Sequence, residues 1–180
     1  MSSPDADRRS LVLDSAMATF ARFGYRKTSM EEVARAADIS RPGLYFLFSS
    51  KETLFRAAVT QTLERDISAI ERVLADTGRP LAERLVDAFD RWAGRYIGAL
   101  SGDITAVIED NPGLLGEIVD ITPRRFEELI TNAIALESTR EAATPVARTL
   151  ISTSIGLKHQ AASREFYVDR MKTAVALLVR

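Results

Sequence analysis

Apolar residues recur at helical spacing along most of this chain, and no stretch sustains the alternation of a half-buried β-strand. Leu13, Ala16, Met17 and Phe20, for example, follow the i, i+3, i+4, i+7 pattern of one helix face. The pattern predicts an all-α fold. A length of 180 residues with 46% hydrophobic residues is enough for one substantial core, or for a small module joined to a larger one.

Composition disfavours several kinds of site. The sequence has no cysteine and a single histidine, His159, so we expect neither disulfides nor a thiolate or His-rich metal site. No apolar run approaches the roughly 18 residues of a membrane span, and the first ten residues lack the apolar segment of a secretory signal. Nucleophile elbows, phosphate-binding loops and metal-ligand spacings are also missing from the sequence. We therefore expect a cytoplasmic protein that is not an enzyme and carries no metal or cofactor.

Charge is distributed unevenly along the chain. Residues 1–60 contain nine Lys and Arg against seven Asp and Glu, a net charge of +2. Residues 61–180 contain 15 against 18, a net charge of −3. The first third is therefore the part better suited to meet an anion such as phosphate.

Capping signals predict three helices in the first part of the chain. Gly24 is placed to end a first helix, and Ser29 starts a capping box for a short second helix. Ser49 with Glu52 forms a further capping box, which predicts a long helix that Gly78 ends. This long helix would connect an N-terminal domain at residues 1–50 to a C-terminal domain at residues 51–180.

Prolines divide the second part of the chain. Pro112, Pro123 and Pro145 each follow an Asn or a Thr, a pairing that is typical of an N-cap and the first helical position. The resulting helices are predicted at residues 80–100, 103–110, 112–120, 123–138, 145–161 and 163–179.

The stretch SRPGLYFL, residues 40–47, carries turn and strand signals although both flanking segments are helical in pattern. As a helix, it would place Leu44, Leu47 and Phe48 on one arc, with Pro42 and Phe46 on the opposite side and Tyr45 on the flank. Pro42 is tolerated because it falls in the first turn, where its missing N–H has no intrahelical partner. A hairpin would need a second alternating strand before Pro42, and the sequence offers none. The context therefore favours a helix.

Three residues, Asp-Ile-Ser at positions 38–40, separate this helix from the one that begins near Met30, and Ser40 is its expected N-cap. Helix, short turn and helix is the spacing of a helix-turn-helix, whose second helix enters the DNA major groove.

Residues 11–55 resemble the DNA-binding domain of the TetR family of bacterial transcriptional repressors. The matching pieces are Phe20 with Phe23-Gly24-Tyr25, the Thr28-Ser29 helix start, and the segments VARAADIS, LYFLF and SKE. The resemblance covers about a quarter of the chain. It implies a C-terminal helical bundle that holds a small-molecule pocket and dimerises through its last two helices.

The resemblance and the helix geometry together select a set of candidate DNA contacts. Arg41, at the tip of the recognition helix, could pair with guanine or with phosphate, and the Tyr45 hydroxyl could reach a phosphate. Phe46 stands where many family members have a polar side chain, and it could touch a thymine methyl group or pack back against the first helix. Tyr45 and Lys51 also fit as a core-rim tyrosine and a solvated lysine. The full set is Thr28, Ser29, Ser40, Arg41, Pro42, Gly43, Tyr45, Phe46 and Lys51. Arg8 and Arg9 could form an arm toward a minor groove.

The C-terminal part offers weaker signals. Trp92, Tyr96, Phe126 and Ile130 lie on apolar stripes that suit a helical core, and they are our candidates for a pocket that binds an apolar or aromatic effector. The faces of the last two helices could pair with their twofold copies in a four-helix bundle. The candidate dimer residues are Leu150, Ser154, Leu157, Ala161, Tyr167, Met171, Ala174, Val175 and Leu178.

These observations and the resemblance imply a homodimeric repressor that binds a palindromic operator and is released by a small-molecule effector. The alternative is a dimeric helical ligand-binding protein without sequence-specific DNA binding, because Pro42, Gly43 and Phe46 give the recognition helix an unusually apolar face.

Overall fold

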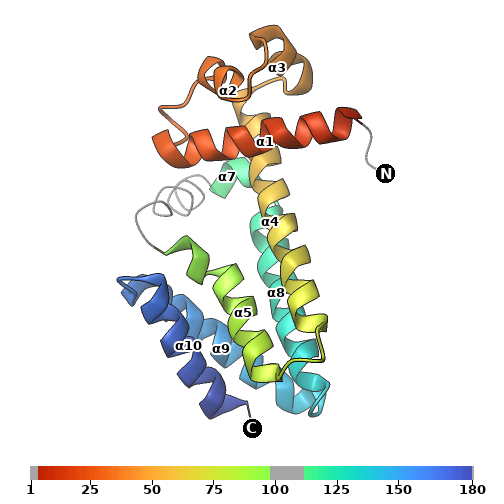
Figure 1. The fold of residues 1–180 in the computed structure, drawn as a ribbon, viewed down its shortest axis with the longest axis vertical. Coiled ribbons are helices and arrows are strands. Elements are labelled where there is room, and N and C mark those ends of the chain that lie inside the picture. The colour runs from red at the N-terminus through yellow and green to blue at the C-terminus, as the bar shows by residue number, and fades with distance from the viewer. Residues whose placement is uncertain (1–3, 98–111, 180) are drawn as a thin grey trace. The chain divides into compact units, whose positions relative to one another are not determined.

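Residues 4–97 and 112–179 are described by the computed structural model, and all of their regular elements are helical (Figure 1). The predicted all-α fold is confirmed. Within these ranges, no helix is both long enough and apolar enough to cross a membrane.

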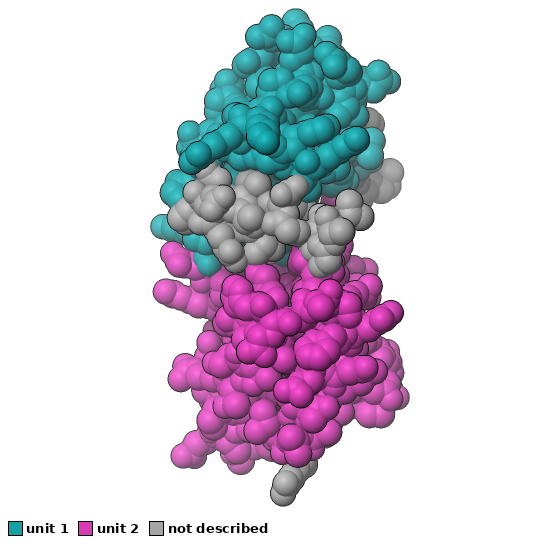
Figure 2. Space-filling view, turned by 90° about the vertical axis from the view of Figure 1, so that its left-hand side faces the viewer, with its two compact units in different colours: residues 1–64, 100–119 teal, residues 65–99, 120–180 magenta. Residues whose placement is uncertain are grey.

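The described residues form two compact units (Figure 2), and each unit has its own hydrophobic core. The first unit comprises residues up to Glu64 together with residues 112–119. Its elements are α1 (Pro4–Phe23), α2 (Met30–Ala36), α3 (Arg41–Leu47), the first half of α4 (Lys51–Ala75), and α7 (Pro112–Leu115).

Local signals explain how the helices of the first unit begin and end. Gly24 ends α1 with a φ of +78°, a conformation that glycine adopts without strain. The Ser29 hydroxyl accepts from the Glu32 N–H while the Glu32 carboxylate accepts from the Ser29 N–H, so the predicted capping box is present. This bond from the Ser29 N–H holds the pKa of Glu32 below its usual range.

The turn between α2 and α3 is a Schellman motif. Asp38 has a φ of +51°, the Ile39 N–H donates to the Ala34 carbonyl at 3.0 Å, and the Asp38 N–H donates to the Arg35 carbonyl at 3.3 Å. These bonds fix the direction in which the chain leaves α2, and therefore the direction of α3.

The start of α4 differs from the prediction by one residue. The cap is Ser50 rather than Ser49, since the Ser50 hydroxyl accepts from the Thr53 N–H and the Thr53 hydroxyl accepts from the Ser50 N–H. A threonine hydroxyl thus replaces the expected Glu52 carboxylate, which instead pairs with Arg56.

The second unit comprises residues 65–97 and 120–179. Besides the second half of α4, its elements are α5 (Leu81–Trp92), the 3₁₀ turn η1 (Gly94–Tyr96), α8 (Ile118–Ala135), α9 (Arg140–Gln160) and α10 (Arg164–Leu178). Here α10 contacts both α5 and α9, and the core is lined by the inner faces of the helices.

Several predicted boundaries in this part were wrong. The helix predicted at 80–100 ends at Trp92, and the segment predicted at 112–120 is helical only to Leu115 before α8 begins. Pro123 and Pro145 lie inside α8 and α9 rather than at their starts. A buried residue lies N-terminal to each proline, Thr122 directly before Pro123 and Ala143 two residues before Pro145, so the turn that precedes the proline is packed against the protein. The helix predicted at 103–110 lies outside the described residues.

By packing, the first unit also extends beyond the predicted domain boundary at residues 50 and 51. Leu54, Phe55, Ala58 and Val59 of α4 all belong to the core of the first unit, and so does Leu115 of α7. The boundary was drawn at a helix start, but a helix as long as α4 contributes to both cores.

Candidate nucleic-acid interface

The back of α3 anchors this short helix in the first unit. Leu44 is fully buried, and Phe48, the C-cap of α3, is 3% exposed. Both lie on the buried side of the helix, as predicted from their spacing. Ser40 caps the N-terminus by accepting from the Gly43 N–H at 3.1 Å, which confirms the predicted cap. Pro42 lies in the first turn, where it costs no hydrogen bond.

The outer face of α3 combines one cation, one phenol and two apolar side chains. Arg41, Pro42, Tyr45 and Phe46 are exposed. The Arg41 guanidinium lies 5.8 Å from the centre of the Tyr45 ring, one helical turn away. Phe46 is 90% exposed, so it does not pack back against α1. The seven-residue helix is therefore packed on its inner side and exposed on its outer side. We call the four exposed residues, Arg41, Pro42, Tyr45 and Phe46, the reading face of α3.

Arg9 holds the far end of α3, a contact that sequence reasoning missed. Its guanidinium donates to the Leu47 carbonyl at 3.1 Å and lies 4.2 Å from the centre of the Phe48 ring. Since Arg9 is part of α1, it ties the first helix to the last turn of α3. Arg9 was a candidate for a minor-groove arm, but in the structure its guanidinium contacts α3 instead. The sequence could not reveal this contact, because Leu47 and Phe48 lie far away along the chain.

Lys51, at the start of α4, is engaged within the protein. Its ammonium donates to the carbonyls of Tyr25 at 3.0 Å and Thr28 at 3.1 Å, and it lies 4.5 Å from the centre of the Tyr25 ring. Two of its three N–H groups therefore hold the loop between α1 and α2.

Two neighbouring candidates differ in exposure. Ser29 is exposed at the start of α2, whereas Thr28 is 2% exposed and its hydroxyl donates to the Gly24 carbonyl at 2.9 Å. The Thr28 hydroxyl thus stabilises the loop rather than facing solvent. Sequence position alone could not distinguish the two residues, because both stand at the same helix start.

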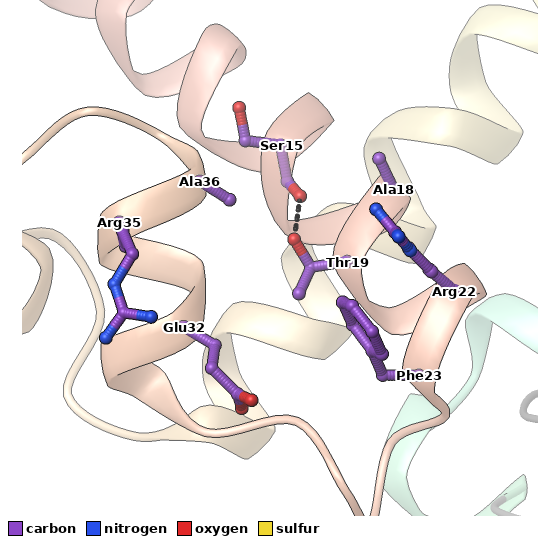
Figure 3. A pocket seen from close by; sticks show the side chains of 8 residues that line it. All are labelled: Ser15, Ala18, Thr19, Arg22, Phe23, Glu32, Arg35 and Ala36. Atoms are coloured by element: carbon purple, nitrogen blue, oxygen red, sulfur yellow. Dashed lines mark hydrogen bonds between the residues drawn. The ribbon is translucent and has the colours of Figure 1, made fainter.

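A shallow hollow of about 490 Å³ lies between α1 and α2, on other residues than those of α3 (Figure 3). Its wall on α1 includes Thr19, whose hydroxyl donates to the Ser15 carbonyl at 2.7 Å, and the side chains of Arg22 and Phe23. Glu32 and Arg35 complete it from α2. The Glu32 carboxylate is already bonded to Ser29, so the hollow adds no free acid to the interface.

The four candidate pocket residues of the second unit have different surroundings. Phe126 and Ile130 are at most 1% exposed and belong to the core. Trp92 stacks on Phe126 with ring centres 4.5 Å apart and an interplanar angle of 7°. Phe126 and Ile130 therefore lie in the core of the second unit and Trp92 packs against it, which is the simpler of the two interpretations that the sequence left open.

Tyr96 belongs instead to a polar cluster. Its hydroxyl donates to Asp66 of α4, and the other Asp66 oxygen pairs with Arg95 at 2.7 Å. Burial raises the pKa of Asp66, which is 5% exposed, and burial together with the Asp66 carboxylate raises the pKa of Tyr96. This cluster ties η1 to the middle of α4.

The face predicted to form a dimer interface is mostly internal. Leu150 and Ser154 of α9 and Tyr167 and Met171 of α10 are at most 2% exposed, and the Ser154 and Tyr167 hydroxyls bond to each other at 2.6 Å. Leu157 and Val175 are buried in the same core, Ala161 and Ala174 are partly buried against it, and only Leu178 is exposed. The sequence showed that these helices have an apolar face, but the face packs within the core of the second unit.

The outward faces of α9 and α10 carry apolar side chains of their own. Ile155 is 55% exposed, Phe166 47% and Leu177 64%. Next to Ile155, a Cβ atom added at Gly156 would meet no other atom within 4 Å. These faces were not selected from the sequence because their apolar residues are few and widely spaced.

Known proteins match this chain over different lengths. The family model described as bacterial regulatory proteins, tetR family, matches residues 12–58, which run from α1 into α4. The HTH-type transcriptional regulator RutR of Escherichia coli is 27% identical over 145 residues, which cover 66% of this chain and 68% of RutR. The nicotine-responsive transcriptional repressor HdnoR of Paenarthrobacter nicotinovorans is 30% identical over 89 residues, covering 48% of this chain and 45% of HdnoR.

The fold is also shared over nearly the whole length. A TetR-family transcriptional regulator from Mesorhizobium loti superposes with a TM-score of 0.77 at 20% identity, covering 98% of this chain and 97% of that one. At this identity the likeness concerns the fold alone. The family model is confined to the helix-turn-helix region, whereas the match to RutR extends over 66% of the chain. Together with the geometry of α2 and α3, these matches identify residues 12–58 as a helix-turn-helix domain of the TetR type, in a chain that is similar to helix-turn-helix transcriptional regulators.

Proposed function

We propose that this regulator binds a palindromic DNA operator as a homodimer, represses transcription from it, and is released by a small-molecule effector. The observation that carries the proposal is that one side of α3 is buried in the protein while the other side is exposed. Leu44 and Phe48 fix the helix from behind, while Arg41, Tyr45 and Phe46 are held outward with no competing role in the core. A helix of this kind suits the major groove, whose width accommodates it.

The proposed contacts divide into specifying and positioning groups. Arg41 donates to guanine or to phosphate from the first turn of α3, and the Tyr45 hydroxyl donates to a phosphate. Ser29, Ser50 and Lys51 are placed at helix starts, where backbone N–H groups and a cation attract phosphate oxygens. Ser40, Pro42 and Gly43 complete the surface that approaches the groove. Thr28 is left out because its side chain is buried.

The proposed dimer forms through the outward faces of α9 and α10. Exposed Ile155, Phe166 and Leu177 supply apolar area, and the open surface beside Gly156 gives a second copy room to approach. Dimerisation also fits DNA recognition, because two recognition helices about 34–36 Å apart, or a multiple of this, would meet successive major grooves.

Oligomeric state tests this surface directly. Light scattering coupled to size exclusion should give a dimer for the wild-type chain and a monomer for Ile155→Asp combined with Leu177→Asp. The matched control is Leu136→Asp, since Leu136 is 70% exposed but lies outside α9 and α10. A dimer that survives the double substitution would place the interface elsewhere.

Effector release would act through helices that belong to both units. Lys51 begins α4 in the first unit, and Asp66 of the same helix lies in the polar cluster of the second. Similarly, Val119 of α8 packs in the first core and Phe126 in the second. We propose that an apolar or aromatic effector in the second unit shifts these helices and alters the separation of the two recognition helices. A preference of roughly 1–3 kcal/mol for the non-binding arrangement changes DNA affinity about 5- to 150-fold.

The proposal as a whole is tested by selecting bound sequences from a random duplex pool with purified protein. A twofold-symmetric motif should be enriched by the wild type and lost with Arg41→Ala and with Tyr45→Ala. If no motif emerges, even after the protein is unfolded, washed free of ligand and refolded, the chain is instead a helical ligand-binding protein without sequence-specific DNA binding.

A further inference from the structure

Phe46 has the largest exposed fraction among the large apolar side chains of the described residues, and it lies at the centre of the reading face of α3. A single exposed aromatic residue on a protein surface is ordinary. Its place is what matters here, because it stands on the recognition helix one residue after Tyr45 and one turn after Pro42. The buried Leu44 and Phe48 on the opposite side keep the ring directed away from the protein.

The chemistry of this part of the face restricts what it can recognise. A phenylalanine ring has no hydrogen-bonding group, and neither the Pro42 ring nor Gly43 adds a polar side chain. The Ser40 hydroxyl, at the N-cap of the same helix, accepts a hydrogen bond from the Gly43 N–H. Base edges in the major groove offer hydrogen-bond donors and acceptors, together with one apolar group, the C5-methyl group of thymine.

We propose that Phe46 recognises the C5-methyl group of a pyrimidine in each half of the operator. Thymine carries this group in ordinary DNA, and 5-methylcytosine carries the same group at the same ring position. The regulator would therefore respond to cytosine methylation wherever a cytosine occupies that position. The inference rests on the proposed operator binding and adds the chemical identity of one contact to it.

The expected size of the effect follows from the area that one methyl group buries. Losing a single buried methyl contact lowers affinity about fourfold, and losing it in both halves of a palindrome lowers affinity about 15-fold. Since Phe46 carries no polar group, exchange of thymine O4 for cytosine N4 beneath the ring should matter less than the loss of the methyl group.

The test replaces each thymine of the selected operator, one symmetric pair at a time, with deoxyuridine, which removes only the methyl group. Equilibrium binding should fall about 15-fold for one pair and little for the others. In the second arm, cytosine at that pair is compared with 5-methylcytosine, and the methylated duplex should bind more tightly by a similar factor. Phe46→Ala should abolish both differences, while Leu136→Ala, a change at an exposed leucine of the other unit, should preserve them.

Each contrary outcome is informative. If no symmetric operator is selected, the proposed function fails before this inference is reached. If an operator is found but every thymine pair tolerates deoxyuridine, operator binding stands and methyl recognition by Phe46 is wrong. If the deoxyuridine effect persists unchanged in Phe46→Ala, another group or the shape of the DNA senses the methyl group, and the assignment to Phe46 is also wrong.

Discussion

Leu44 and Phe46 lie two residues apart on α3 in opposite surroundings, which makes them a matched pair for substitution. Leu44 is fully buried, so Leu44→Ala removes its packing contacts and leaves a cavity, at a cost of about 2–5 kcal/mol in the free energy of unfolding. Phe46 is 90% exposed, so Phe46→Ala should change that free energy by less than about 0.5 kcal/mol. DNA binding should reverse the ranking, because a folded Leu44→Ala protein keeps the reading face that Phe46→Ala loses.

Urea unfolding followed by far-UV circular dichroism measures both variants. With a slope of about 2 kcal/mol per molar urea, Leu44→Ala should lower the midpoint by roughly 1–2.5 M, and Phe46→Ala should leave it nearly unchanged. The single tryptophan, Trp92, belongs to the second unit, so its fluorescence in the same titration shows whether that unit unfolds together with the first. Equal losses of stability in the two variants would refute the assignment of the two faces.

Three further substitutions test individual contacts. Arg9→Ala removes the hydrogen bond to the last turn of α3 and should cost about 1 kcal/mol in urea unfolding, together with weaker operator binding; unchanged values for both would contradict its positioning role. Tyr167→Phe leaves the Ser154 hydroxyl without its buried partner and should cost about 1–3 kcal/mol at neutral pH. Burial raises the pKa of Tyr167 to about 12, so folded wild type keeps a proton that the unfolded chain releases above about pH 10. Wild-type stability should therefore fall between about pH 10 and 12, and Tyr167→Phe should reduce this slope; an identical slope in both proteins would contradict the assignment. Gly94→Ala would bring a Cβ atom within 2.9 Å of the Tyr167 ring and should cost about 1–3 kcal/mol, whereas Gly113→Ala, with no atom within 4 Å, should be well tolerated in the same thermal melts. Equal melting temperatures for these two variants would argue against close packing at Gly94.

The helix-turn-helix could be predicted from sequence because its determinants are local. Ser40 as cap, Pro42 in the first turn and the spacing of Leu44 and Phe48 all act within one or two turns of α3. The left-handed conformation of Asp38 was not predicted, since such a turn usually carries a glycine. Here the two backbone bonds of the Schellman motif accompany an aspartate instead.

The same local rules failed at Pro123 and Pro145. Each follows a residue type that caps helices well, yet the preceding turn is held in helical form by buried residues such as Ala143. Thr139, rather than Thr144, caps α9. Sequence spacing cannot report such burial, because it depends on which other helices pack there.

Long-range contacts were beyond sequence reasoning for the same reason. An apolar stripe at Leu150 or Met171 indicates a buried face, but the stripe is the same whether its partner is the rest of the protomer or a second copy. Arg9 and Lys51 likewise show their roles only through carbonyl groups that lie far away in the sequence.

The most direct test of the central claim is the ratio of affinities for the selected operator and for random duplex DNA, measured from low to physiological salt. If the outer face of α3 recognises DNA sequence, both affinities should weaken as salt rises, the operator should be preferred by at least about 1,000-fold at physiological salt, and Arg41→Ala should reduce that preference sharply. A ratio near one at every salt concentration, with dimer and fold intact, would contradict the account and leave a helical protein that does not recognise DNA sequence.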